Sequence, residues 1–131
     1  MFNYFKQSFA RKKARRITQA YPPIINKFDL GKYGEIDFAN WSNPIAPAVS
    51  VDYQMVAFFN QFIKAGDLAI DIGANIGDTT VPMALCTGTT GLTIGFDPNP
   101  FVVKILNENV NLNKDKYKIA AEQCAISTTP A

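Results

Sequence analysis

The stretch Leu68-Ala-Ile-Asp-Ile-Gly-Ala-Asn-Ile-Gly-Asp78 decides the fold of this 131-residue chain. A short apolar run reaches a carboxylate and then passes through two glycines, Gly73 and Gly77, before apolar residues resume. Glycine adopts backbone angles that are closed to other residues and lets a ligand approach the main chain. Pro82 is tolerated only near the start of a helix. The pattern therefore predicts a strand, a tight loop and a helix from Asp78, whose first N–H groups favour a bound ligand.

A second motif, Leu92-Thr-Ile-Gly-Phe-Asp97, has the same form. It is a short apolar run between Gly91 and Pro98, which predicts another buried strand that ends on a carboxylate. Its acid follows Gly77 by 20 positions. In a βαβ unit that interval places an acid beside the first loop, where it can accept both hydrogen bonds of a ribose diol. The pair of motifs favours a ligand site over a turn that binds nothing.

Asp97 has a competing structural role, as a turn former or helix cap within Asp-Pro-Asn-Pro. Asn99 suits the cap better, because Pro100 then occupies the first helical position. We therefore expect Asp97 to be free for a ligand.

The residues of the loop also bear on which nucleotide it would bind. A dinucleotide loop requires Gly-x-Gly-x-x-Gly, but Asn75 and Asp78 stand at the second and third glycine positions. Asp71 and Asp78 would repel a pyrophosphate and attract a cofactor that carries a sulfonium and an ammonium, as S-adenosylmethionine does. A phosphate-binding P-loop is excluded, since Gly-x-x-x-x-Gly-Lys-Ser/Thr is absent from the sequence.

Asp71-Ile-Gly-Ala-Asn-Ile-Gly-Asp-Thr-Thr80, followed by Gly95-Phe-Asp-Pro-Asn-Pro100, resembles the class I S-adenosylmethionine-dependent methyltransferases, and most closely the FkbM-type family. The resemblance extends upstream through Tyr33-Gly-Glu-Ile-Asp-Phe-Ala-Asn-Trp-Ser-Asn-Pro44 and downstream to Cys124-Ala-Ile-Ser127, about two thirds of the chain. It implies an α/β fold with a Rossmann-like parallel sheet.

The resemblance also implies the cofactor contacts. The loop from Gly73 to Gly77 would hold the methionine end, Asp97 the ribose, and the residues after a third strand, Ala125 and Ile126, would lie near the adenine. The implied reaction is methylation of a hydroxyl on a sugar or metabolite, with catalytic residues unassigned. The implied cofactor-binding residues are Asp71, Gly73, Ala74, Asn75, Gly77, Asp78, Asp97, Pro98, Ala125 and Ile126.

Part of the family pattern has no counterpart in these 131 residues. The family is similar to a seven-stranded sheet with a further acidic segment on the fourth strand, whereas only Ser-Thr-Thr-Pro-Ala follows our predicted third strand, residues 117–126. We interpret residues 50–131 as the cofactor-binding half of a methyltransferase domain, with an open sheet edge, an exposed apolar helix face and poor solubility when alone. A second chain could complete the sheet. One alternative is a truncated cofactor-binding module without independent catalysis, and another is a dinucleotide-binding oxidoreductase.

Two cysteines, Cys86 and Cys124, stand far apart, and the sequence contains no histidine. This implies no metal site and favours buried thiols in a reducing compartment, so we expect a cytoplasmic protein. The lack of histidine also removes the usual base at neutral pH. No apolar run approaches the roughly 20 residues of a membrane span.

The first 20 residues carry six basic side chains and no acid, while the other seven basic residues stand against all eleven acids, so that the remainder has a charge of −4. Phe2, Phe5 and Phe9 recur at helical steps before the basic cluster, which predicts a basic amphipathic helix within residues 1–20. A packing helix with a solvated basic side is our preferred interpretation. Contact of residues 1–16 with an anionic membrane surface, with nucleic acid or with an acidic partner remains open; of these, nucleic acid is not expected.

Residues 21–49 are predicted to form a hairpin and a loop, because residues 27–38 alternate apolar and polar side chains around a glycine-containing turn. A helix capped by Ser50 or a nearby residue is expected to continue to residue 64. Another is expected over residues 100–113, packed on the sheet. The expected core-facing stripe of the first helix is Val51, Met55, Phe58, Phe59, Phe62 and Ile63.

Overall fold

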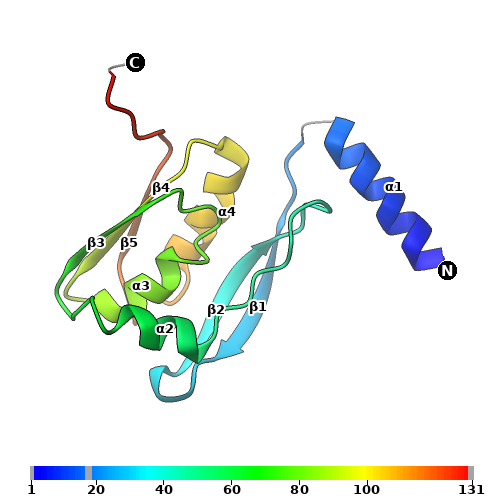
Figure 1. Ribbon diagram of the computed structural model, residues 1–131. Helices are drawn as coiled ribbons and strands as arrows, with labels where there is room; N and C mark the ends of the chain where they lie inside the picture. The colour runs from blue at the N-terminus through cyan, green and yellow to red at the C-terminus, as the bar shows by residue number, and fades with distance from the viewer. Residues whose placement is uncertain (1, 17–18, 130–131) are drawn as a thin grey trace.

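The structure, a computed structural model, describes residues 2–16 and 19–129. Helices lie between a parallel sheet on one side and a two-stranded hairpin on the other, with the N-terminal helix set apart from both (Figure 1). The elements in chain order are α1 (Phe2–Arg16), β1 (Pro23–Asp29), a 3₁₀ turn (Gly31–Tyr33), β2 (Glu35–Trp41), α2 (Tyr53–Phe59), β3 (Leu68–Ile72), α3 (Thr80–Thr87), β4 (Leu92–Phe96), α4 (Pro100–Asn111) and β5 (Ile119–Glu122).

The parallel sheet has the strand order β3-β4-β5, with α3 joining β3 to β4 and α4 joining β4 to β5. The α/β prediction is thus confirmed. Strand β4 ends one residue before Asp97, as the motif predicted. Strand β5 is shorter than the predicted residues 117–126, because Tyr117 turns into the core before the strand and the chain from residue 123 onward is exposed.

The two faces of this sheet differ. On the helix side Thr93 and Gly95 are buried, and the Thr93 hydroxyl lies 3.2 Å from that of Thr87 in α3. On the other side Leu68, Ile70 and Ile72 of β3 are 62%, 53% and 65% exposed. The expected exposed apolar surface thus includes this face of the sheet, whereas the large apolar residues of α3 and α4 are mostly buried between the sheet and the hairpin.

Helix α4 begins as predicted, since the Asn99 side chain accepts hydrogen bonds from the N–H groups of Phe101 and Val102, and Pro100 is the first helical residue. Helix α3 begins at Thr80, two residues later than expected from the sequence. The intervening residues turn instead, and the first helix-type hydrogen bond runs from the Val81 N–H to the Gly77 carbonyl.

The hairpin is longer than predicted and pairs Pro23 with Trp41 at one end and Asp29 with Glu35 at the other. Helix α2 is shorter than the predicted helix to residue 64. Its cap is Asp52, whose side chain accepts from the Met55 N–H, and beyond Phe59 the chain continues in tight turns. The expected stripe is therefore divided: Val51 is buried ahead of the helix, whereas Phe58 and Phe62 are 54% and 68% exposed.

The cysteines differ in their surroundings. Cys86 is buried, and burial raises the pKa of its thiol. Cys124 is exposed, which corrects the expectation that both thiols are buried, since it follows the end of β5. Within residues 2–16 and 19–129, no helix has both the length and the apolar character that crossing a bilayer requires.

Candidate cofactor-binding site

Three carboxylates gather where the strands of the parallel sheet end. Asp71 lies in β3 opposite Gly95 of β4, Asp97 directly follows β4, and Glu122 is the last residue of β5, paired with Phe96. The carboxyl ends of parallel strands lie at one edge, where α/β sheets bind their ligands. The sequence motifs are thus brought together at the edge where a ligand is expected.

The loop after β3 is folded by hydrogen bonds to the end of β4. The N–H groups of Gly73 and Ala74 both donate to the Phe96 carbonyl at 2.9 Å. Gly73 and Gly77 have φ angles of 82° and 104°, and Asn75 has φ of 48°, so the positive-φ conformations expected of the two glycines are present. The loop shape is therefore held by backbone contacts to β4.

Asp97 is tied to this loop. Its Oδ2 accepts from the Asn75 N–H at 3.0 Å, and its Oδ1 accepts from the Asn99 N–H at 2.9 Å. The expectation that Asn99 replaces Asp97 in the turn is therefore wrong, because the Asp97 carboxylate also orders the turn and connects it to the glycine loop. That Asp97 is free for a ligand stays a prediction. A carboxylate offers about four acceptor positions, so acceptor capacity remains for ribose hydroxyls on this partly exposed side chain.

Asp71 is about half-buried on the helix side of the sheet. Its Oδ2 accepts a 2.7 Å hydrogen bond from the Thr80 hydroxyl at the start of α3. Burial raises the pKa of Asp71, the Thr80 hydrogen bond opposes that rise, and the nearby charge of Asp78 adds to it. Burial and the neighbouring charge of Asp78 both disfavour the ionised form of Asp71. A positively charged group would relieve this, so the site is suited to receive one.

The two loop glycines have different surroundings. A Cβ added at Gly73 would meet no atom within 4 Å, so the backbone there faces open space. A Cβ at Gly77 would lie 3.1 Å from Leu106 of α4, and one at Gly95 would lie 2.9 Å from the Cβ of Ala74. Packing accounts for Gly77 and Gly95, whereas Gly73 leaves room for a ligand.

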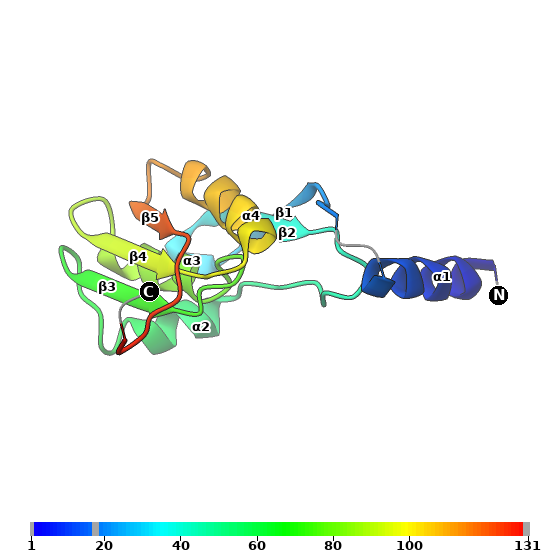
Figure 2. The ribbon, with the colours of Figure 1, turned by 90° about the horizontal axis from the view of Figure 1, so that it is seen from above.

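The other predicted site residues are more scattered. Asp78 lies beside Asn75, whose side-chain amide is 3.5 Å from its Oδ1, and Pro98 is exposed just after Asp97. Ala125 and Ile126 lie in the exposed segment beyond β5, which runs past the carboxyl ends of the strands (Figure 2). No protein wall encloses them, and their assignment to an adenine pocket stays a prediction.

Sequence reasoning missed two polar residues at this edge. Thr80 belongs to the quoted motif, but nothing in a single sequence signalled that its hydroxyl would reach back to Asp71. Glu122 could have been found, since it is the acid nearest the end of the third strand. Among the described residues, no group of three or more Cys, Asp or Glu side chains is arranged to hold a metal ion.

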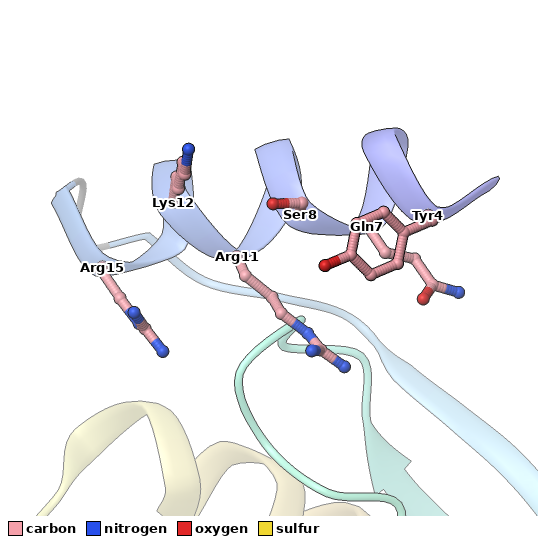
Figure 3. A pocket seen from close by; sticks show the side chains of 6 residues that line it. All are labelled: Tyr4, Gln7, Ser8, Arg11, Lys12 and Arg15. Atoms are coloured by element: carbon pink, nitrogen blue, oxygen red, sulfur yellow. The ribbon is translucent and has the colours of Figure 1, made fainter. Parts of the chain in front are cut away.

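Hollows also occur along α1, away from the sheet edge. One, of about 220 Å³, is lined by six residues of that helix (Figure 3), namely Tyr4, Gln7, Ser8, Arg11, Lys12 and Arg15. Side chains of a single helix cannot enclose a small ligand, because no second element closes the space. We therefore place the candidate cofactor site at the carboxyl edge of the sheet.

Of the comparisons with known proteins, only the one with solved structures bears on the fold. No family model and no curated protein matches the sequence. The structure of TYW2 from Pyrococcus horikoshii in complex with MeSAdo is similar with a TM-score of 0.61 and 19% identity, over 86% of this chain and 40% of that one. The fold resembles the Rossmann-like fold of methyltransferases.

A second structure from Pyrococcus horikoshii, PH0793, described only as a transferase, matches with a TM-score of 0.53 and 17% identity. It covers 77% of this chain and 36% of its own length. The present chain thus spans about two fifths of the length of the two solved structures. At these identities the likeness shows the fold, and membership of the FkbM-type family stays a prediction.

Proposed function

We propose that this chain is the cofactor-binding half of an S-adenosylmethionine-dependent methyltransferase. The observation that carries the proposal is the position of two carboxylates, Asp71 and Asp97, on either side of a loop whose backbone faces open space at Gly73. A similar structure contains MeSAdo, an analogue of S-adenosylmethionine, which supports the same cofactor here.

The residues present fit such a cofactor. Asp97 is held by Asn75 and Asn99 in a position to accept ribose hydroxyls, and the backbone at Gly73 leaves room for the methionine end. Asp71 and Asp78 supply negative charge for the sulfonium or the ammonium. The fit rests on this chain's own geometry and charge.

When bound, S-adenosylmethionine supplies a methyl group on a sulfonium, which a nucleophile attacks in line. The part of the protein in such a reaction is to align the two reactants and exclude water. The described residues supply the holding groups at the strand ends, while the exposed edge leaves the acceptor side open. We propose a hydroxyl oxygen of a sugar or metabolite as acceptor, in keeping with the FkbM-type resemblance.

A cofactor-binding module without independent catalysis is the second candidate. It is favoured by the uncovered sheet face of β3, where three large apolar side chains are more than half exposed. Parallel sheets are normally covered on both faces, so a further layer is required for a complete domain. In this version, a second chain or a further segment would supply the acceptor site.

Isothermal titration calorimetry of the purified chain with S-adenosylmethionine, and with NAD as the comparison, tests the cofactor assignment. We expect saturable binding of S-adenosylmethionine and weaker or no binding of NAD. Tighter binding of NAD would replace the proposal with the dinucleotide alternative, and absence of binding by folded protein would reject the cofactor site.

A matched pair of substitutions locates the binding. D71N keeps an acceptor for the Thr80 hydroxyl but removes the charge, so it should weaken S-adenosylmethionine binding without loss of thermal stability. D67N makes the same change at an exposed carboxylate outside the site, next to the turn before β3, and should leave affinity unchanged. Equal affinities for D71N and D67N would contradict the role of Asp71.

A further inference from the structure

Helix α1 presents an aromatic surface that the rest of the described chain does not cover. It has no buried residue, and Phe2, Phe5 and Phe9 are 85%, 65% and 72% exposed. The interpretation preferred from the sequence, a packing helix with a solvated basic side, is therefore wrong within residues 2–16 and 19–129, where α1 buries no side chain. The hollows between α1 and the Asn43–Pro47 loop are lined on the helix by Lys6, Gln7, Ala10, Arg11 and Arg15, and not by the phenylalanines.

The aromatic stripe is bordered by long basic side chains. One hollow of about 400 Å³ is formed by Phe9 with Lys12, Lys13 and Arg16, and another of about 500 Å³ combines the three phenylalanines with Lys6, Ala10 and Lys13. Lysine and arginine can lay their alkyl stems along an apolar surface while the charged ends reach polar groups. Rings flanked by such side chains are typical of helices that lie in a lipid headgroup layer.

The charge of α1 points to an anionic surface. All six of its ionised groups are basic and none is acidic. Two like-charged pairs stand four residues apart, Arg11 with Arg15 and Lys12 with Arg16, an arrangement that destabilises an isolated helix. A surface that supplies negative charge would remove this repulsion.

The length of α1 leads to the same conclusion. It has 15 residues and no buried side chain to anchor it, and isolated helices of about 12–15 residues are marginal in water. Burial of the phenylalanine stripe in an apolar layer would provide the missing support.

We propose that residues 2–16 form an interfacial helix that binds an anionic lipid surface, with Phe2, Phe5 and Phe9 in the acyl boundary and the basic residues among the headgroups. Nucleic acid would neutralise the basic charges but offers no apolar layer for three rings on one helix face. In proteins that bind single-stranded nucleic acid, the aromatic rings that stack on bases lie in grooves or on sheets. An acidic protein with a polar surface is disfavoured because it too offers no apolar layer for the three rings. The proposal is independent of the cofactor site.

Flotation of the purified full chain with vesicles tests this proposal. We expect binding to phosphatidylcholine vesicles that contain phosphatidylserine and little binding to pure phosphatidylcholine vesicles. Far-UV circular dichroism should show a gain in helix on binding. Because each basic side chain near an anionic surface strengthens binding by a factor of about five, the K12Q/K13Q/R16Q variant should bind at least about tenfold more weakly.

Matched variants separate this surface from general effects. K104Q/K114Q/K118Q removes the same charge from exposed positions on the body and should bind like the unmodified chain. F5S/F9S should lose binding, whereas F62S, at a phenylalanine that is 68% exposed outside α1, should retain it. Every substituted side chain here is exposed, so the fold of the body is not at risk.

Three results would overturn the proposal. The first is absence of binding to anionic vesicles, and the second is binding that survives deletion of residues 2–16. The third is a partner other than lipid: an RNA oligonucleotide that binds the chain, with loss in K12Q/K13Q/R16Q but not in F5S/F9S, would identify nucleic acid instead.

Discussion

Asp97 combines two tasks in one carboxylate. It orders the turn into α4 through the Asn99 N–H and fastens the glycine loop through the Asn75 N–H, while part of its surface stays open to solvent. A ligand that uses its remaining acceptor positions would meet a group already held in place by the backbone. Such preorganisation reduces the ordering that binding requires.

Replacing Asp97 by Ala should weaken S-adenosylmethionine binding by about 1–3 kcal/mol, because ribose hydroxyls would lose their acceptor. Calorimetry of D97A against the unmodified chain measures the difference. N99A is the control, since it removes the cap of α4 at a cost of about 1 kcal/mol in stability but leaves the carboxylate. If D97A bound as tightly as N99A, Asp97 would have no ribose role.

Tyr117 gives the fold a dependence on alkaline pH. Its side chain is 2% exposed, and its hydroxyl donates to the Asn109 carbonyl and accepts from the Asn113 amide. Burial raises the pKa of Tyr117 to about 12, from an ordinary value of 10.0. A folded-state pKa above the unfolded one gives stability that is complete below about pH 10 and is lost as pH rises through about 12.

The shift of about two pKa units corresponds to a loss of at most about 2.7 kcal/mol over that pH window. Urea unfolding between about pH 9 and about pH 12 measures it, with Y117F as the comparison that lacks the titrating group. Lysines titrate in the same range and should contribute equally to both proteins. Parallel stability curves for the two would contradict the assignment to Tyr117.

At the scale of elements, two side-chain amides, one in α4 and one two residues after its end, connect the hairpin to the helix layer. Asn109 accepts from the Ala39 N–H and donates to the carbonyls of Ala39 and Ile76, so it joins β2 to the glycine loop. Asn113 makes a similar pair of bonds with the N–H and carbonyl of Asp37. Asn113 lies beyond α4 with a φ of 52°, and the two amides contact alternate residues of β2, Asp37 and Ala39.

Replacing Asn109 by Leu should destabilise the fold by about 2–4 kcal/mol, because buried backbone groups of Ala39 and Ile76 would lose their partners. Urea denaturation measures the change in unfolding free energy. N107L, the same substitution at an exposed position of α4, is the matched control and should change stability by less than about 0.5 kcal/mol. Similar values for both variants would mean that the amide contacts contribute little.

At the scale of the whole molecule, one face of the parallel sheet has no layer of structure packed against it among the described residues. Leu68, Ile70 and Ile72 of the edge strand β3 are more than half exposed, and β3 pairs with β4 alone among the described residues. Exposed apolar edges are sites of self-association. The same face is where a completing layer would dock.

We expect the isolated chain to self-associate in size-exclusion chromatography, and L68K/I70K to shift it toward the monomer. The control I24K/I25K makes the same kind of change at β1 residues that are 52% and 50% exposed, and should have a smaller effect. A monomeric profile of the unmodified chain would contradict the expectation, as would equal effects of both variants.

The sequence by itself determined the two strand-loop motifs, the helix from Pro100 and the presence of a hairpin, because these depend on local signals: apolar runs, glycines with positive φ, and an Asn-Pro cap. Only the tertiary structure decided which groups meet. The Thr80 bond to Asp71, the second bond of Asp97 and the Asn109 contacts join residues whose sequence separation carries no local pattern. The exposed stripe of α1 and the bare face of β3 were likewise decided in three dimensions, because burial depends on what packs against a face and not on the face alone.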